Sequence, residues 1–431
     1  MSLYSDEQLK TEYFDPSIFI DKNRIIYNLS GHHLAYLPNM RITDLAVTRS
    51  ARNTKLNRLA GVYSLIKNAR LLDGATELSA LREANRFLGF KNQNQNRGYA
   101  MSVRNQLVGS AIGFEYCGED RKLRQAGYEP DGAGATKDAS GTFTIDLREI
   151  FPILKSISHL PTDLFKNLRI EIEFENLSTP ALDILVDANQ DGSVQRPLLA
   201  VDYLDNPMIV KKMEPALKTL GWLEIEEDSF FVSRVDATAG GSQDLAQVTN
   251  EKSMGFQNKH VERLLIAKEI VDVQDGGGFL NTNIVRPAYG PLGSYAGFKE
   301  SLQVRLNGKN ILPREGLTKP NEALSYLVDT WGDCALYPEA NTTDVGIAMN
   351  NIINEDGTIV ATADDFRGAH SYFGIYLGDR VQDLQINYER HTLHDTRTIV
   401  RPTNENTRVH IYCEVKKALQ VNGGKYNIVY V

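Results

Sequence analysis

Cysteine is scarce in this sequence. The 431 residues contain three cysteines, Cys117, Cys334 and Cys413, which lie far apart. A disulfide framework or a zinc knuckle needs several cysteines at short spacing, so neither is expected. Histidine is nearly as rare, with 8 residues and no His-x-His pair, which argues against the paired metal sites of a two-domain cupin. We therefore expect neither a metal nor a cofactor.

Long apolar runs and an excess of positive charge are also missing. No apolar run approaches the ~18–20 residues that cross a bilayer. The first ten residues, MSLYSDEQLK, lack the basic and apolar regions of a secretory signal, so we expect the product to stay inside the cell that makes it. The 47 basic and 55 acidic residues give a formal charge of −8. This balance argues against direct nucleic-acid binding, which needs a basic face.

Alternation of apolar and polar residues is the dominant pattern in the sequence. In residues 168–175, LRIEIEFE, the two kinds of residue alternate as in a half-buried strand. Residues 302–307 alternate in the same way and end at Asn307-Gly308, a pair that favours a tight hairpin. Further strands are expected at residues 24–29, 41–48, 62–69, 198–203, 230–235, 260–271, 372–377, 409–415 and 426–431.

Helical signals are few. The stripe formed by Leu78, Leu81, Ala84 and Leu88 predicts a helix over residues 77–88. Other short helices are expected after the capping box Asp146/Glu149, between Asn206-Pro207 and Pro215, and over residues 320–331. The predicted fold class is therefore mainly β, with short helices in the connections.

An internal repeat divides the chain. Residues 167–173, NLRIEIE, can be aligned with residues 383–389, DLQINYE, which begin 216 positions later, about half the length of the chain. Together with the length, this indicates two similar β-domains of about 200 residues each, joined between residues 206 and 228. That size suits two tandem eight-stranded jelly rolls with long loops. We assign residues 1–20 to an N-terminal arm, 21–215 to the first jelly roll and 216–431 to the second.

Clusters of histidine and carboxylate side chains give only weak metal-site signals. His391 and His394 lie near Glu389 and Asp395, but residues three apart on a strand point to opposite faces. A solvated loop is the favoured interpretation. The adjacent pair His32-His33 also diverges on a strand, so the same interpretation applies to it.

The remaining ligand-like segments each lack a required feature. Residues 187–192, DANQDG, resemble the start of a calcium loop, but the twelfth position is Leu198, where a bidentate Glu is required. An Asx-rich turn is the favoured interpretation, and a structural calcium stays open as the alternative. Residues 132–137, GAGATK, lack the spacing of a phosphate loop. Cys413 lies on the apolar face of a strand, so core packing is its expected role. We assign no catalytic, cofactor-binding or metal-binding residue; a pair of carboxylates for glycoside hydrolysis stays open, because sequence does not give their separation.

Two segments of the first half resemble a known family. Residues 151–154, FPIL, precede residues 160–174, LPTDLFKNLRIEIEF. Together they are similar to a signature of a short helix followed by L-P-x-x-L-F-x-N-L-R and alternating apolar residues. That signature occurs in the double-jelly-roll major capsid proteins of polinton-like viruses and virophages.

The second half carries three more segments that resemble this family, in the same order. Residues 302–313, LQVRLNGKNILP, are similar to its N-G hairpin. Residues 324–333, LSYLVDTWGD, resemble its D-T-W-G helix end, although Ser325 departs from a hydrophobic position. Residues 372–375 and 381–388 resemble the last family block. The resemblance covers roughly residues 140–176 and 300–390, and the first 130 residues fit only by pattern.

The resemblance implies a structural function and no enzyme activity. Members of this lineage, which includes adenovirus hexon and tailless phages with internal membranes, form homotrimeric capsomers. Six jelly rolls then give a pseudo-hexagonal base. The chain is expected to be the major capsid protein of an icosahedral double-stranded DNA virus. Its expected partners are further copies of itself, neighbouring capsomers, and penton and minor capsid proteins, and an internal membrane is compatible with the lineage.

Particular segments of the chain acquire expected roles from the resemblance. The long loops would form the outer tower and the contacts between capsomers. Residues 1–20 would be an arm that orders against a neighbour, a membrane-side protein or the underside of the shell. A frayed terminus is the alternative for these residues.

Two other functions are compatible with a pair of jelly rolls. A glycan-acting enzyme predicts one concave site with convergent carboxylates or a metal. A sugar-binding fibre or adhesin module predicts binding through the end loops and no closed shells. The sequence favours the capsid protein, because it lacks a cluster of catalytic chemistry and has long, neutral loops.

Overall fold

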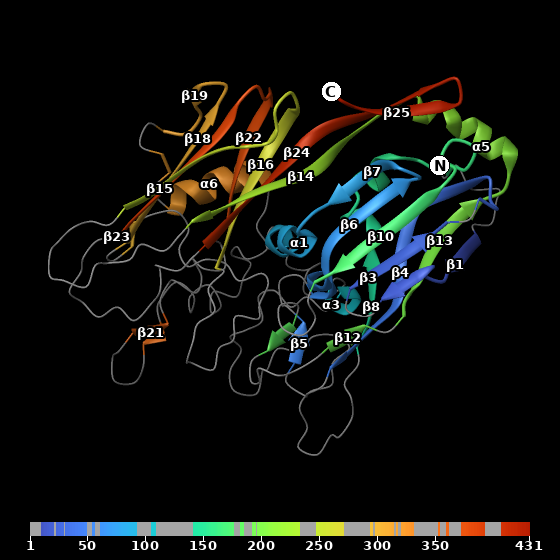
Figure 1. Cartoon of the computed structure of the whole chain (residues 1–431), viewed down its shortest axis with the longest axis horizontal. Coiled ribbons are helices and arrows are strands. Elements are labelled where there is room, and N and C mark those ends of the chain that lie inside the picture. The colour runs from blue at the N-terminus through green and yellow to red at the C-terminus, as the bar shows by residue number, and fades with distance from the viewer. Residues whose placement is uncertain are drawn as a thin grey trace, which may run out of the picture.

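Alternating apolar residues fold this chain into antiparallel strands. The structure is a computed structural model of the 431-residue chain. It describes residues 10–20, 23–29, 31–49, 54–56, 61–92, 105–108, 141–175, 182–184, 192–194, 196–232, 247–270, 294–295, 298–313, 316–317, 320–331, 352–353, 359–361, 372–392 and 407–431. These residues form two β-sandwiches side by side, each made of two sheets (Figure 1), so the predicted mainly β class is confirmed.

The first half of the chain builds the first sandwich. Its strands are β1 (Lys10–Phe14), β2 (Ile18–Ile20), β3 (Arg24–Asn28), β4 (Ala35–Arg49), β6 (Ile66–Asp73), β7 (Thr76–Leu81), β8 (Gly141–Asp146), β9 (Leu160–Pro161), β10 (Leu168–Phe174), β12 (Gly192–Val194) and β13 (Leu198–Leu204). One sheet has the order β1-β13-β4-β12, with β8 and β9 also paired to β4, and the other has the order β2-β3-β10-β6-β7. Tyr27, Ile42 and Ile170 are among the buried side chains that fill the gap between the two sheets.

The second half builds the second sandwich. Its strands are β14 (Thr219–Val232), β15 (Gln247–Ser253), β16 (His260–Ile270), β17 (Ser294–Tyr295), β18 (Phe298–Leu306), β19 (Lys309–Asn310), β22 (Tyr372–Arg380), β23 (Leu384–Thr392), β24 (Thr407–Asn422) and β25 (Lys425–Tyr430). One sheet has the order β14-β24-β16-β22, with β25 paired to β24, and the other has the order β15-β23-β18-β17, with β19 paired to β18. Val304, Ile386 and Ile411 belong to its own apolar core.

Helices and short strand pairs occupy the connections. The helices are α1 (Ala84–Asn92), α3 (Asn105–Val108), α4 (Ile153–Ser156), α5 (Pro207–Met213) and α6 (Pro320–Trp331), with 3-10 turns η1 (Gly61–Leu65), η3 (Leu147–Glu149) and η4 (Glu214–Leu217). Two small sheets pair β5 (Thr54–Leu56) with β11 (Leu182–Ile184) and β20 (Ile352–Ile353) with β21 (Ile359–Ala361). The predicted cap of α5 is confirmed, because the Asn206 side chain accepts a hydrogen bond from the backbone N–H of Met208 at 3.0 Å. The helix predicted over residues 320–331 is α6.

The two sandwiches repeat one topology. Strands β1, β13, β4 and β8 neighbour one another in the same order as β14, β24, β16 and β22. Likewise β3, β10, β6 and β7 have the order of β15, β23, β18 and β19, and a helix follows both β7 and β19. The aligned sequence repeats are the equivalent strands β10 and β23. The predicted pair of eight-stranded jelly rolls is therefore confirmed.

The prediction of one helix over residues 77–88 was wrong. Residues 76–81 form β7, which pairs with β6 across a turn in which Gly74 has φ +59°. The helix α1 starts only at Ala84, after Glu83 takes a positive φ of 47°. The apolar stripe was real, since Leu78 and Leu88 are both buried, but it came from a strand and a helix placed in succession.

One other boundary also differs from the prediction. Of residues 62–69, expected to form a strand, residues 62–65 lie in the 3-10 turn η1, and the strand begins at Ile66. Residues 10–14 pair with β13 and residues 18–20 pair with β3; the assignment of residues 1–20 to an N-terminal arm stays a prediction. The predicted boundary at residues 215 and 216 falls in η4, between β13 and β14, and stays a prediction.

Candidate functional site

The two sandwiches share an apolar contact, which we call the joint. It is made where β14 lies beside β7 (Figure 1) and also contacts α4. Leu220 and Trp222 of β14 and Tyr412 of β24 belong to the same buried cluster as the core of the first sandwich. At the joint, the outer face of the second sandwich is therefore not exposed to solvent. Its apolar side chains pack into the core of the first sandwich.

Strand β16 shows how one strand serves two cores. Leu264 and Ile266 point into the core of the second sandwich. Leu265 and Ala267, which alternate with them, join the cluster of the first sandwich. Because successive side chains of a strand point to opposite faces, β16 separates the two cores and is apolar on both sides.

Aromatic side chains give the joint a fixed geometry. The rings of Phe87 on α1 and Tyr412 on β24 lie 5.1 Å apart between centroids and are tilted by 52°. The Tyr412 hydroxyl donates a hydrogen bond to the backbone carbonyl of Glu83 at 3.2 Å. A buried tyrosine that packs its ring and satisfies its hydroxyl contributes both apolar area and orientation.

A second aromatic contact lies near the β6–β7 turn. The ring of Tyr426 on β25 packs against Phe165 with 4.9 Å between centroids. The Tyr426 hydroxyl donates to the carboxylate of Asp73 at 2.8 Å. Burial and this hydrogen bond raise the pKa of Tyr426. The last strand of the chain is therefore held against the first sandwich.

One acidic side chain is buried in the joint. Glu224 of β14 is 1% exposed; its Oε1 accepts from the Ser79 hydroxyl of β7 at 2.8 Å and its Oε2 accepts from Nε1 of Trp222 at 2.9 Å. Burial raises the pKa of Glu224 to about 7, although the positive charge of Lys417 opposes the shift. Sequence reasoning missed this residue, because the segment that contains it was assigned to the link between domains.

The helix α6 closes the joint beside β22. The guanidinium of Arg263 stacks 4.1 Å from the centre of the Trp331 ring and donates to the backbone carbonyl of Thr330 at 2.7 Å. Its Nη2 also donates to Glu414 at 3.1 Å. Gly374 makes room for the indole, since a Cβ at that position would lie 2.4 Å from Cδ1 of Trp331.

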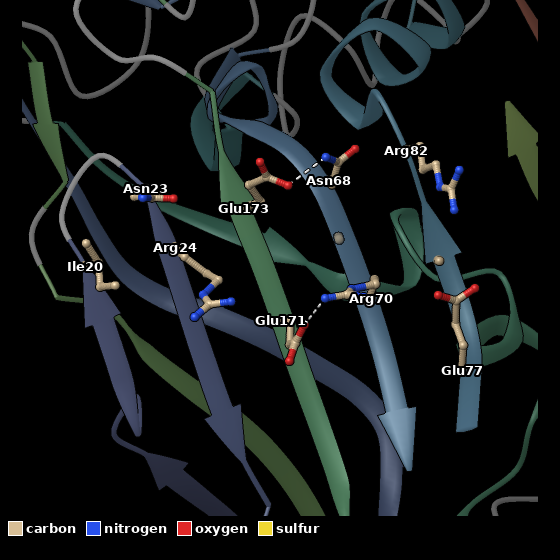
Figure 2. A pocket seen from close by; sticks show the side chains of 11 residues that line it. Ile20, Asn23, Arg24, Asn68, Arg70, Glu77, Arg82, Glu171 and Glu173 are labelled. Atoms are coloured by element: carbon tan, nitrogen blue, oxygen red, sulfur yellow. Dashed lines mark hydrogen bonds and ion pairs between the residues drawn. The ribbon is translucent and has the colours of Figure 1, made fainter. Parts of the chain in front are cut away.

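A shallow depression of about 550 Å³ lies on the outer face of the β2-β3-β10-β6-β7 sheet. Figure 2 shows Arg70 directed at Glu171 and Asn68 directed at Glu173, from β6 toward β10. Its charged lining consists of Arg24, Arg70, Arg82, Glu77, Glu171 and Glu173. Equal numbers of positive and negative groups give the depression no preference for a ligand of one charge.

The histidine and cysteine residues considered from the sequence have differing outcomes. His33 contacts Glu12 at 2.9 Å and Asp205 at 3.0 Å, and its ring stacks on Tyr203 with 3.5 Å between centroids. This arrangement, which sequence reasoning missed, ties β1 to the end of β13. Burial raises the pKa of the Cys413 thiol, as the predicted core position requires.

Several sequence candidates lie outside the described residues. They are Cys117, Cys334, His394, Asp395, the glycine-rich residues 132–137, and all of residues 187–192 except Gly192. Of the pair at the end of β23, the structure describes the backbone of His391 but not its side chain. Within the described part of the chain, no group of three His, Cys, Asp or Glu side chains could hold a metal ion. No helix in that part is long and apolar enough to cross a membrane.

Comparisons with known proteins identify the fold. No protein-family model matches the chain, and no curated protein matches it in sequence. Among solved structures, the chain is similar to a chain of the Sputnik virophage determined by cryo-electron microscopy, with a TM-score of 0.60 and 10% identity over 98% of this chain and 88% of that one.

Two structures of major capsid proteins show the same similarity. The Faustovirus protein matches with a TM-score of 0.55 and 8% identity over 96% of this chain and 90% of its own. The mavirus protein matches with a TM-score of 0.54 and 10% identity over 97% and 90%. The fold is therefore that of the double-jelly-roll major capsid proteins, as the sequence resemblance implies.

Proposed function

We propose that this chain is the major capsid protein of an icosahedral virion and has no catalytic role. The observation that supports this most directly is the repeated jelly-roll topology, which extends over the chain and matches viral major capsid proteins over at least 90% of their length. The expected location is the virion capsid. The expected partners are neighbouring capsomers and penton and minor capsid proteins, without direct contact to the genome.

We also propose that three copies form a pseudo-hexagonal capsomer. The joint brings together two unlike surfaces, the β7 and α1 side of one sandwich and the β14 and β24 side of the other. A contact between unlike surfaces closes into a ring when it is repeated around an axis. If the second sandwich of each copy uses its equivalent side against the first sandwich of the next, three copies place six sandwiches in one ring.

Exposed apolar side chains support a contact surface on the first sandwich for the second sandwich of the next copy, which we call the receiving surface. Tyr13 of β1 and Ile18 and Ile20 of β2 are 61%, 42% and 47% exposed. Strand β2 is the edge of its sheet opposite β7, and β1 is the edge of the other sheet, on the side away from β14 (Figure 1). Apolar groups gathered on one side of a soluble chain favour a protein contact there.

The mass of the purified protein tests this assembly. One chain has a mass of 48.2 kDa, so light scattering should give three times that value, about 145 kDa, at micromolar concentration. Negative-stain images should show triangular or hexagonal outlines. A monomer at that concentration, or elongated rods in the images, would contradict the capsomer.

A charge placed on the receiving surface should separate the copies. In the double variant Ile18→Glu/Ile20→Glu, two carboxylates would have to be buried in the contact, so the scattering mass should fall to that of one chain. The matched control Ile18→Val/Ile20→Val keeps the apolar surface and should stay trimeric. A trimer that survives the glutamates would show that β2 is not the receiving edge.

A further inference from the structure

Glu224 connects the two sandwiches through a side chain that can change its charge. It belongs to β14 of the second sandwich, and its partner Ser79 belongs to β7 of the first. Both are 1% exposed, and the oxygen atoms of the bond lie 2.8 Å apart. A buried carboxyl group inside an apolar contact is costly to ionise. Its protonation state therefore affects how well the sandwiches fit together.

The partners of Glu224 determine where a proton would be held. The indole Nε1–H of Trp222 can only donate, so Oε2 must accept in either state. A proton on the neutral acid therefore belongs on Oε1. There it is donated to the Ser79 hydroxyl oxygen, which can either donate or accept. When the acid loses its proton, the same two oxygen atoms stay hydrogen-bonded, but the Ser79 hydroxyl becomes the donor and Oε1 of Glu224 the acceptor.

The charges around Glu224 do not compensate its ionisation in full. The titratable side chains near Glu224 include Lys417 on β24, Glu226 on the same strand, Tyr430 on β25, Glu77 on β7 and Lys155 on α4. Lys417 favours the anion of Glu224, whereas the Glu226 anion opposes it. Glu226 already pairs with Lys259, lies 3.6 Å from Nζ of Lys417 and accepts from the Tyr430 hydroxyl at 2.8 Å, and Lys155 pairs with Glu149 at 3.3 Å. Burial is the largest influence and raises the pKa of Glu224 to about 7.

We propose that Glu224 is a proton-operated latch of the joint: the neutral acid holds the sandwiches together, and loss of its proton loosens them. The direction follows from linkage. The native state binds this proton more tightly than the unfolded chain, whose glutamate has a pKa of 4.5. The stabilisation is complete at acidic pH and is lost as the pH rises from about 4.5 through about 7. This goes beyond the proposed capsid function, because it concerns the contact within one chain.

Tryptophan fluorescence can report the latch directly. The sequence has 2 tryptophans, Trp222 and Trp331, so the variant Trp331→Phe leaves one indole, whose N–H donates to Glu224. We expect its emission to titrate with a midpoint near pH 7 and the titration to disappear when Glu224→Gln is added. The histidines, among them His410 beside Glu227, are unchanged in that control. A titration that persists in the glutamine variant, or an emission constant from pH 5 to pH 9, would overturn the latch.

Two neighbouring charges allow a test that keeps Glu224 in place. Lys417→Met should raise the fluorescence midpoint, because it removes the charge that favours the anion, and Glu226→Gln should lower it. Opposite shifts of these two variants support the latch, whereas equal midpoints contradict it even if Glu224→Gln fails to fold. The readout does not depend on the number of copies, so its failure would leave the capsid proposal standing, and a monomeric protein could still show the latch.

Discussion

At the scale of single residues, the joint depends on positions where a small change in volume is felt. Gly374 of β22 lies under the Trp331 indole, and the missing side chain is what permits this close approach. Trp331 in turn supports the guanidinium of Arg263, which bonds to the end of α6. The position of the Trp331 indole, and through it the position of the Arg263 guanidinium, therefore depends on the glycine.

Gly374→Ala should therefore destabilise the protein. The new Cβ would lie 2.4 Å from Cδ1 of Trp331, so the indole must move and lose its stacking with Arg263. Overpacking of this kind costs about 1–3 kcal/mol, measurable as a lower free energy of unfolding in urea. The matched control is Gly221→Ala, whose Cβ would lie 3.7 Å from the nearest atom and should change stability by less than about 0.5 kcal/mol. Equal costs for the two variants would argue against the close approach.

The helix cap and the turn that were predicted correctly depend only on interactions between residues close together in the sequence. Asn206 caps α5, and Asn307-Gly308 adopts the positive φ values of 51° and 79° that its hairpin needs. Glu224 could not be found in this way, because its burial depends on Ser79, which lies 145 positions earlier. Alternation alone would place Glu224 on the polar side of an ordinary strand.

At the scale of elements, α1 contributes an aromatic side chain of the first sandwich to the joint. Its Phe87 is 1% exposed and packs on Tyr412. Phe87→Ala would leave a cavity between two elements of different sandwiches, so the expected loss is about 3–5 kcal/mol of unfolding free energy in denaturant.

A volume-conserving control separates cavity formation from a general effect of mutation. Phe87→Leu keeps most of the buried volume and should cost less than about 1.5 kcal/mol. If Phe87→Ala were no worse than Phe87→Leu, the ring contact with Tyr412 would not be a major part of the joint.

The elements also show which sequence patterns are ambiguous. The helix α6 was predicted correctly, because proline at its start and glycine after its end mark its limits. The error over residues 77–88 arose because Leu78, Leu81, Ala84 and Leu88 are spaced as on one helix although β7 and α1 share them. The turn Gly74-Ala75 joins β6 to β7 as Asn307-Gly308 joins β18 to β19, and its glycine was the signal that could have identified β7 as a returning strand.

At the scale of the whole molecule, the class and the duplication could be predicted, but the joint could not. Period-two patterns and the repeat at Leu168 and Leu384 are properties of each half separately. The sequence at the beginning of β14 did indicate contact on both faces of the strand, since the apolar residues Trp222 and Ile225 lie on opposite faces. Both are buried in the structure. A strand apolar on both faces indicates cover on both sides, although it does not say by what.

Because one buried cluster includes both halves, they should unfold together. Differential scanning calorimetry of the intact chain should show one transition, with the calorimetric enthalpy equal to the van't Hoff enthalpy per cooperative unit. Two resolved transitions would mean that the sandwiches are stable separately and that the joint contributes little. Phe87→Ala should broaden or split the transition if it weakens the joint as expected.

Strand β16 has one face in each core, which favours a fixed angle between the two halves of the chain while the joint is closed. In a shell built from this protein, each chain with a closed joint would then act as one tile. Curvature would have to be accommodated at the seams between tiles, so shells of different radius would differ in those seams and not within the chain.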